Sequence, residues 1–493
     1  MARPRWLEII DPLKSLELIK GNKNMQITNS SSSSAGHALS SITMGKKLCC
    51  VLTALGILHL ISTSVTAKPP NVIVIYTDDQ GTIDLNCYGA KDLVTPELDK
   101  LARQGVRFTQ FYAAAPVCSP SRAAVLTGRF PQRAGVPGNV SSQPGGHGMP
   151  AAQITMAEMF KKAGYQTAHI GKWHLGFDKQ TMPNNQGFDY SFGHMGGCID
   201  NYSHFFYWNG PNRHDLWRNG DEIWQDGRYF PELMVQEASR FVRQNQDKPF
   251  FMYFAMNIPH YPLQGTAKWR EVYKDLKPPR RMYATMVSTM DEMIGKFIGE
   301  IDQLGIRENT IIVYQSDHGH SQEERTFGGG GSAGIYRGAK FSLFEGGIRV
   351  PAIISWPGTL PSNVVRHQLA TACDWFPTVA HLAGIPLGSQ HVDGRNIQPV
   401  ISSNDAASPH EVFHWQTGGG PNAAWAVRRQ QWKLLGNPRD TSNKAPLTKS
   451  DKLFLVNLNT DPGEMNNLAA KHPELVAELL KLHHDWYANV MTQ

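Results

Sequence analysis

Two apolar runs that end in carboxylates constrain the fold of this chain more than any other feature. Residues 71–76 (NVIVIY) lead into Asp78 and Asp79, and residues 310–314 (TIIVY) lead into Asp317. Short, continuously apolar and β-branched runs are typical of buried parallel strands. The pattern predicts an α/β fold that delivers acidic side chains to the carboxyl edge of its sheet, where open sheets of this class bind ligands.

The carboxylates at this edge form a candidate metal site, although a solvated turn is the plainer interpretation of an acidic pair. Asp78 and Asp79 are adjacent and repel each other unless a cation lies between them, and Asp317 is expected at the same edge. Carboxylate oxygens are the ligands that hard divalent cations prefer. The acidic edge therefore predicts a divalent metal.

The remaining patterns predict alternating strands and helices. Thr95 precedes a helix that stops at Gly105, and Thr155 with Glu158 forms the capping box of another. A stripe of Met, Ile and Phe over residues 286–301 has helical spacing and is interpreted as core. Further strands are expected at residues 106–111, 166–170, 249–255 and 352–356, and further helices at 232–243 and 371–383.

A change of composition after Ser402 predicts a domain boundary. Close-spaced strands and a final helix follow it, at residues 411–415, 424–428, 432–435, 453–458 and 473–487. The predicted fold is therefore α/β, with a large, mostly parallel sheet sandwiched by helices in residues 68–402. Residues 403–493 are expected to form a smaller domain of antiparallel sheet plus helix.

The stretch CSPSRAAVLTGR, residues 118–129, predicts a reactive cysteine at a helix N-terminus. Pro120 is tolerated only in a first helical turn, and the residues after Arg122 are good helix formers. The helix dipole and Arg122 would make the surroundings of Cys118 attractive to an anion such as sulfate or phosphate. A buried structural cysteine is the alternative on composition alone.

This stretch resembles the signature of the type I sulfatases, in which the cysteine is converted to formylglycine. Residues 171–176 (GKWHLG) and 344–351 (FEGGIRVP) resemble two further family signatures, and the resemblance covers nearly all of residues 70–490. It implies an alkaline-phosphatase-like fold similar to arylsulfatase A and N-acetylgalactosamine-6-sulfatase. It also implies that a formylglycine-generating enzyme modifies Cys118.

The resemblance assigns a cation site to the acidic edge. Asp78, Asp79 and Asp317, with an oxygen of the modified residue 118, would hold Ca²⁺, with Mg²⁺ as the less favoured ion. Related sulfatases commonly have Asn immediately after the last of these aspartates, whereas this chain has His318. A nitrogen ligand in place of an oxygen leaves open whether His318 binds the cation.

The resemblance also implies hydrolysis of sulfate esters. One hydroxyl of the formylglycine hydrate would attack sulfur, and His174 would accept the proton of the second hydroxyl so that sulfate is expelled. Arg122 would hold the hydrate. The sulfate would be bound by Lys172, Lys340 and His260, and either of the last two would protonate the leaving oxygen.

Aromatic residues in a long irregular stretch, residues 188–230, suit the faces of sugar or aryl groups and are interpreted as the substrate rim. A loop packed by its own aromatic side chains is the alternative. The glycine run at residues 327–332 is interpreted as a mobile lip over the site. The expected substrate is a sulfated carbohydrate or an aryl sulfate. A phosphodiesterase or phosphonate-monoester hydrolase of the same superfamily and a catalytically dead glycan-binding protein are the alternatives.

A segment near the N-terminus predicts export. Residues 44–67 combine a basic start, a short apolar run and small residues before a cleavage point after Ala67, as in a secretory signal peptide, with Met44 as the natural start. The run is shorter than the ~20 residues of a membrane span, so no stable span is expected, although an uncleaved signal anchor is the alternative. The expected location is periplasmic or extracellular, or a lysosomal-type lumen in a eukaryote.

The composition is ordinary for a folded, exported protein of this length. The formal charge is +6 for the whole chain and +2 without residues 1–67, which gives no support for nucleic-acid binding. Beyond Cys118, the folded part contains Cys87, Cys198 and Cys373, which allow at most one disulfide. The chain is therefore not a disulfide scaffold.

Overall fold

A ten-stranded mixed sheet forms the centre of the structure, a computed structural model that describes residues 68–208, 210–445 and 447–492. The upstream segment and the proposed signal peptide lie outside the described residues. From one edge to the other, the strands are β13 (Val364–Arg366), β2 (Val106–Phe108), β12 (Ala352–Ser355), β11 (Thr310–Ser316), β1 (Asn71–Thr77), β10 (Phe250–Ala255), β4 (Gln166–Lys172), β5 (Tyr190–His194), β8 (Trp217–Arg218) and β9 (Asp221–Glu222). The central strands β11, β1, β10, β4 and β5 are mutually parallel, and β12 and β8 run against them.

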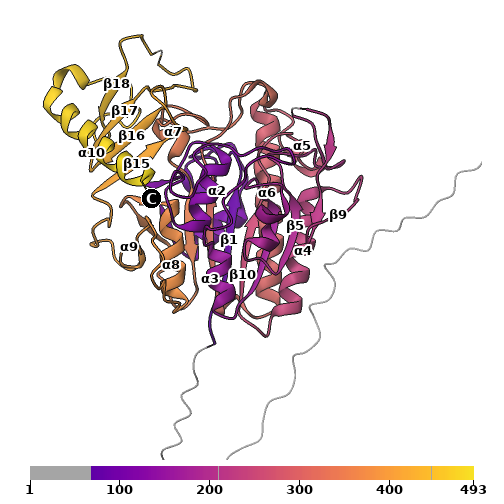
Figure 1. Ribbon diagram of the computed structural model, residues 1–493. Coiled ribbons are helices and arrows are strands. Elements are labelled where there is room, and N and C mark those ends of the chain that lie inside the picture. The colour runs from indigo at the N-terminus through magenta and orange to yellow at the C-terminus, as the bar shows by residue number, and fades with distance from the viewer. Residues whose placement is uncertain (1–67, 209, 446, 493) are drawn as a thin grey trace, which may run out of the picture. The chain divides into compact units, whose positions relative to one another are not determined.

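Helices cover both faces of this sheet because alternate residues of its buried strands point to opposite sides. Val72 and Val74 of β1 belong to one core cluster, and Ile73 and Ile75 belong to the other. The first cluster includes helices α2 (Cys118–Thr127), α3 (Met156–Lys162) and α8 (Trp375–Leu382), and the second includes α1 (Pro96–Arg103), α4 (Phe230–Asn245), α5 (Ala267–Val272) and α6 (Arg280–Gln303). Figure 1 shows the two groups of helices on either side of β1 and β10, so the predicted sandwich is confirmed.

A second, four-stranded antiparallel sheet follows, as predicted. Its strands are β15 (Val412–Gln416), β16 (Trp425–Arg429), β17 (Trp432–Gly436) and β18 (Leu453–Asn457), and helix α10 (Pro473–Met491) packs on it. Short elements complete the described chain: α7 (Glu345–Ile348), α9 (Gln398–Ser402), and the strand pairs β3 (Phe111–Tyr112) with β14 (Ala370–Thr371) and β6 (Phe205–Phe206) with β7 (Arg213–His214). The domain boundary after Ser402 stays a prediction.

Four local predictions are wrong. One is Thr95, expected as the N-cap of α1, whose side chain makes no capping hydrogen bond. The strand expected at residues 106–111 is split between β2 and β3, which belong to different sheets. The stretch expected to be irregular, residues 188–230, contains the short strands β5 to β9, because these residues extend the main sheet and form a hairpin. The glycine run at residues 327–332 does not line the catalytic pocket described below, and a Cβ at Gly331 would collide with His320, so part of the run is packed.

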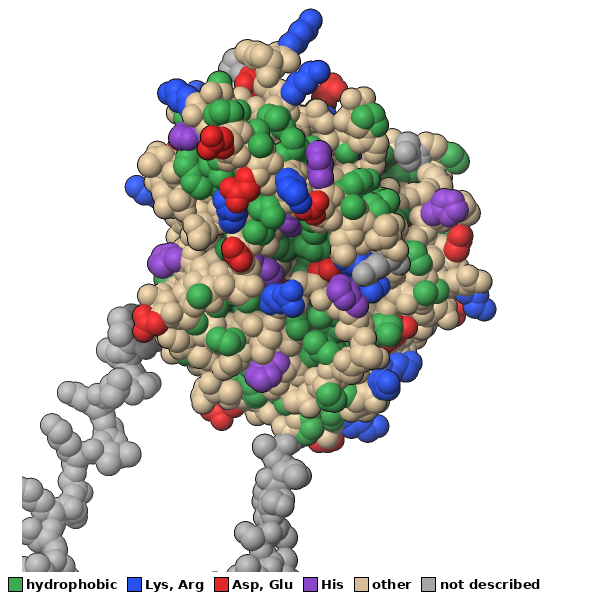
Figure 2. Space-filling model, turned by 60° about the vertical axis from the view of Figure 1, so that its left-hand side comes forward, with side chains coloured by type: hydrophobic (Ala, Val, Ile, Leu, Met, Phe, Trp, Pro, Cys, Tyr) green, Lys and Arg blue, Asp and Glu red, His purple; other side chains and the backbone are tan. Residues whose placement is uncertain are grey.

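Among the described residues, no helix combines the length and the apolar character needed to cross a bilayer. Basic and acidic side chains are interspersed on the face of the molecule that Figure 2 shows. This distribution agrees with the small net charge of the folded part.

Candidate active site

The register of the parallel strands brings the predicted site residues to one edge of the sheet. Thr77 of β1 pairs with Ser316 of β11, and Ala255 of β10 pairs with Gly171 of β4. Residues that follow these strand ends therefore meet at the same level: Asp78 and Asp79 after β1, Asp317 and His318 after β11, Lys172 and His174 at and after the end of β4, and His260 after β10.

Cys118 is the first residue of α2, and its side chain is buried at the centre of this group. Its Sγ lies 3.3 Å from Nε2 of His318 and 3.4 Å from Nζ of Lys172, and it donates to Asp78 Oδ1 over 3.8 Å. Burial opposes ionisation of the thiol, but Lys172 and Lys340 lower the pKa of Cys118 to about 6. The site therefore favours negative charge at position 118.

Arg122 and Lys172 hold the carboxylates beneath Cys118. The Arg122 guanidinium donates to Asp317 Oδ2 at 3.0 Å and lies 3.6 Å from Asp78 Oδ1, and Lys172 Nζ donates to Asp78 Oδ2 at 2.6 Å. Burial works against the charge on Asp78, but Lys172 holds the pKa of that carboxyl well below its usual range. The resemblance predicts that Arg122 holds the hydrate, whereas the described structure directs its guanidinium to the two carboxylates.

The acidic residues fit a divalent cation. Ligand atoms of Asp78, Asp79, Cys118 and His318 all lie within 4.8 Å of one another. The buried Asp79 Oδ1 also lies 2.9 Å from Lys340 Nζ in an ion pair. Burial raises the pKa of Asp79 to about 7 and that of Asp317 to about 6. The positive charge around these two carboxylates therefore does not offset the cost of burying them in the ionised form. A bound cation would supply that charge.

A nitrogen ligand is also available at this position. His318 Nε2 lies 3.5 Å from Asp79 Oδ1 and 3.5 Å from Asp317 Oδ1, while its Nδ1 lies 2.9 Å from the Gly319 carbonyl. Because a carbonyl can only accept, Nδ1 carries the proton and Nε2 faces the carboxylates. Burial disfavours protonation, but Asp317 and the Cys118 thiolate raise the pKa of His318 to about 9. A cation at this site would compete with that proton.

Three further predicted residues surround Cys118. Lys340 Nζ donates to Asp79 Oδ2 at 3.0 Å, and His260 Nε2 lies 3.6 Å from the same oxygen. Burial and the nearby Lys172 hold the pKa of His174 well below its usual value. The imidazole of His174 is therefore neutral, with a buried Nδ1 that makes no hydrogen bond to the described residues.

Two of the predicted site residues, Asp79 and His174, have strained backbones. Asp79 has φ 61° and His174 has φ 52°, in the left-handed region that non-glycine residues rarely adopt. Such conformations cost on the order of 1–3 kcal/mol each and cluster at functional sites, where the surrounding structure holds them. The strain directs Asp79 toward the other carboxylates.

A cavity of about 330 Å³ opens onto Cys118. Phe206 and Trp208 of the aromatic stretch line it, and their contact with substrate stays a prediction. Sequence analysis did not identify the other side of the cavity, where Glu323 and Arg325 lie beside Lys340. Arg325 packs over the rings of Trp208 and Tyr261, and no motif marks it because only the fold brings these segments together.

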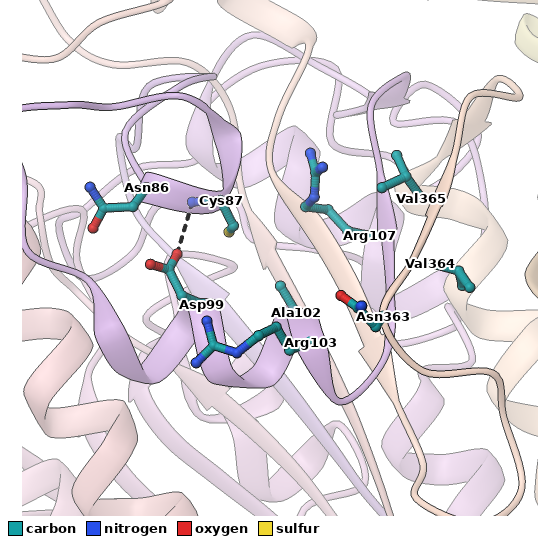
Figure 3. Close-up of a pocket in the computed structure, with 9 residues that line it drawn as sticks. All are labelled: Asn86, Cys87, Asp99, Ala102, Arg103, Arg107, Asn363, Val364 and Val365. Carbon is teal, nitrogen blue, oxygen red and sulfur yellow. Dashed lines mark hydrogen bonds between the residues drawn. The ribbon is translucent and has the colours of Figure 1, made fainter.

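Figure 3 shows another cavity, of about 300 Å³, between α1, β2 and the residues around Asn363. None of its lining residues lines the cavity at Cys118. The backbone N–H of Cys87 donates to Asp99 Oδ1 at 2.8 Å, and burial raises the pKa of the Cys87 thiol. That thiol is therefore unreactive, and the four described cysteines are all free.

Comparisons with known proteins agree with this geometry. The sulfatase family model matches residues 70–385, and the model of the N-sulphoglucosamine sulphohydrolase C-terminal region matches residues 333–486. Human arylsulfatase A is 32% identical over 465 residues, covering 86% of this chain and 89% of its own length. N-acetylgalactosamine-6-sulfatase of Rattus norvegicus is 33% identical over 404 residues, covering 78% of this chain and 74% of its own length.

Solved structures show the same architecture. The crystal structure of Ps i-CgsB in complex with k-i-k-neocarrahexaose matches with a TM-score of 0.76 and 30% identity, over 85% of this chain and 93% of that one. The chain therefore belongs to the sulfatase family and is a sulfuric ester hydrolase.

Proposed function

We propose that this sulfatase is exported and removes sulfate from sulfated carbohydrates, using a formylglycine formed from Cys118 and a bound Ca²⁺. The observation that carries the proposal is the arrangement around Cys118 Sγ, where Lys172 lies at 3.4 Å and three further ligand residues, Asp78, Asp79 and His318, surround the thiol. A modified residue 118 would supply a hydrate oxygen as the nucleophile at a helix N-terminus.

Asp78, Asp79, Asp317 and His318 would hold the cation, which would neutralise sulfate oxygens when bound. The convergence of ligand atoms from Asp78, Asp79 and His318 supports this assignment. The resemblance assigns Arg122 to the hydrate. We infer instead that Arg122 orients the carboxylates of Asp78 and Asp317, since both lie within 3.6 Å of its guanidinium.

The cationic side chains above Cys118 would bind the ester. Lys172 and Lys340 would neutralise the sulfate, and His260 or Lys340 would protonate the leaving oxygen. The neutral imidazole of His174 would accept the proton from the second hydroxyl of the hydrate, a role that its position in the lining of the cavity supports.

A sulfated sugar is the proposed substrate because cations and aromatic rings line the same cavity. Lys340 and Arg325 suit anionic groups, and the exposed ring of Trp208 suits a sugar. The names of two relatives point the same way: one is an N-acetylgalactosamine-6-sulfatase, and i-CgsB was crystallised with neocarrahexaose. The signal-like residues 44–67, which lie outside the described residues, support export of the enzyme.

The first prediction concerns Cys118→Ala, tested on a panel of sulfated oligosaccharides with matched phosphate esters. The variant should fold and should lose turnover by at least ~10²–10³-fold, since removing even one group that stabilises the transition state has that effect. Peptide mass spectrometry of the wild type should show residue 118 as an aldehyde, in which an oxygen replaces the sulfur and two hydrogens are lost.

Cys87→Ala is the matched control, since its thiol lines the other cavity, and it should retain full turnover. Undiminished activity of Cys118→Ala would refute the proposed nucleophile. Faster cleavage of the phosphate esters would indicate the phosphodiesterase alternative, and an unmodified, inactive Cys118 in the native host would indicate the dead binding protein.

A further inference from the structure

A second group of metal-ligating side chains lies outside the catalytic centre. His204 immediately precedes β6, His214 ends β7, and Asp226 lies in the turn after β9. Ligand atoms of these three residues all lie within 4.8 Å of one another. Neither histidine lines the cavity at Cys118.

The backbone holds the three segments together. Phe205 pairs with His214 across the β6–β7 hairpin, and the Asp215 N–H donates to the His204 carbonyl at 2.9 Å. The Gly227 N–H donates to the Tyr202 carbonyl at 2.9 Å, which fixes the turn that carries Asp226 beside His204. The cluster is therefore part of the folded framework.

Each imidazole presents a nitrogen without a proton to the centre of the cluster. His204 Nε2 lies 3.0 Å from the Arg228 carbonyl, and His214 Nδ1 lies 3.0 Å from Glu222 Oε1. A carbonyl and a carboxylate can only accept, so these two nitrogens carry the protons. His204 Nδ1 and His214 Nε2 are left as lone-pair donors.

These two donor nitrogens are buried and have no hydrogen-bond partner among the described residues. Buried polar atoms without partners are rare in folded proteins and call for an explanation, such as an ion. The hydrogen bonds to Arg228 and Glu222 have the pattern that orients metal-binding histidines in proteins.

We propose that His204, His214 and Asp226 bind a zinc ion at a site separate from the catalytic cation. Two imidazole nitrogens and one carboxylate match the three-ligand sites of Zn²⁺, and the exposed Asp226 leaves room for a water as the fourth ligand. The catalytic group, with its carboxylates and single histidine, has the oxygen-rich character that suits Ca²⁺.

The site would stabilise one wall of the catalytic cavity. Phe206 of the same hairpin and the nearby Trp208 line that cavity. Asp215, which follows His214, accepts hydrogen bonds from the N–H groups of Met195 and Gly196 at 3.0 Å and 2.8 Å. The next residue, Gly197, packs against His174. Zinc would thus fix the position of the aromatic wall without touching the substrate.

The experiment is a calorimetric titration of the tag-free full-length chain with Zn²⁺, after removal of bound metals and in excess Ca²⁺ to fill the catalytic site. The wild type should bind one Zn²⁺ per chain. Asp226→Asn, His214→Gln and Glu222→Gln should each weaken binding by ~10-fold or more, since loss of even an orienting partner weakens metal sites by that factor.

His147→Gln is the control, because it removes an exposed histidine and should leave zinc affinity unchanged. Asp226 and Glu222 are exposed, so their variants should fold even where a histidine variant does not. The proposal is overturned if the wild type binds no zinc, if Asp226→Asn and Glu222→Gln bind it as tightly as the wild type, or if Cys118→Ala rather than these variants abolishes binding.

Discussion

Arg122 illustrates how one buried charge organises the catalytic centre. Its side chain is inaccessible to solvent, its NH2 group contacts Asp317 and lies near Asp78, and its NH1 group donates to the Lys172 carbonyl at 3.3 Å. The planar guanidinium can serve all three partners at once, which an ammonium group cannot. This geometry indicates that Arg122 acts on the carboxylates and only through them on the substrate.

The prediction at this scale is that Arg122→Lys raises the Ca²⁺ concentration for half-maximal activity by ~10–100-fold, because residues that orient metal ligands have effects of that size. The rate at saturating Ca²⁺ should remain close to that of the wild type. Both proteins should lose activity after treatment with EGTA and recover it with added Ca²⁺. The measurement is activity as a function of free Ca²⁺.

If the rate of Arg122→Lys stays low at every Ca²⁺ concentration, Arg122 binds the hydrate, as the sequence resemblance predicts. Arg107→Lys is a suitable control, since Arg107 lines the other cavity and should show no change in either quantity.

At the scale of single elements, the start of α1 shows a cap that comes from a distant helix. The sequence predicts that Thr95 caps α1, but its hydroxyl bonds Asn86 Oδ1 at 2.9 Å. The N–H groups of Glu97 and Leu98 donate instead to the carboxylate of Asp291 in α6, at 3.1 Å and 2.8 Å. Asp291 thereby joins two helices that cover the same face of the sheet.

The corresponding prediction is that Asp291→Ala lowers the free energy of unfolding by about 1–3 kcal/mol, since it leaves two N–H groups without their acceptor. Urea denaturation followed by circular dichroism measures this. Asp302→Ala in the same helix removes a carboxylate from an exposed pair with Lys100 and should change stability by less than about 1 kcal/mol. Equal effects of the two substitutions would contradict the capping role.

At the scale of the whole molecule, buried charges connect the four-stranded sheet to the main body. Lys433 of β17 lies 2.9 Å from both Glu345 of α7 and Glu464, and all three side chains are inaccessible to solvent. Burial opposes ionisation of both acids, but Lys433 lowers the pKa of Glu345 to about 2, while burial raises that of Glu464 to about 7. Lys433 thus keeps Glu345 ionised, whereas burial favours the protonated form of Glu464 up to pH about 7.

This difference predicts a pH dependence of stability. Glu464 binds a proton in the folded state up to pH about 7 but releases it above pH 4.5 when unfolded, so its contribution weakens the fold as pH rises through that window. The effect is at most about 1.4 kcal/mol per pH unit. Glu345 has the opposite sign, and its contribution is lost only as pH falls from 4.5 toward about 2.

Relative to the wild type, Glu464→Gln should therefore become more stable as pH rises from 4.5 to about 7. Thermal unfolding at saturating Ca²⁺ across this range measures the difference and keeps the catalytic carboxylates ionised in both proteins. Glu474→Gln, which removes an exposed carboxylate in α10, should leave the pH profile unchanged. A constant difference between Glu464→Gln and the wild type would show that Glu464 is ionised in the folded protein.

The contacts across this junction also reach the catalytic centre. Arg337 pairs with Asp440 at 2.8 Å, and the N–H groups of Gly338 and Ala339 donate to the hydroxyls of Ser442 and Thr441. These bonds hold the loop immediately before Lys340. The C-terminal part of the chain therefore helps to position a residue proposed to bind sulfate.

The local sequence predicted most of the strands and helices from their apolar periodicity, and the resemblance of short, contiguous motifs to a known family supplied the ten candidate site residues. Asp78, Asp317 and Lys172 could be placed at one edge because parallel strands end there together. The tertiary structure alone decided that Asp291 caps α1, that Arg325 lies beside Trp208, and that His204, His214 and Asp226 converge. These contacts join residues far apart in the chain, and their energies depend on burial and geometry that no local pattern encodes.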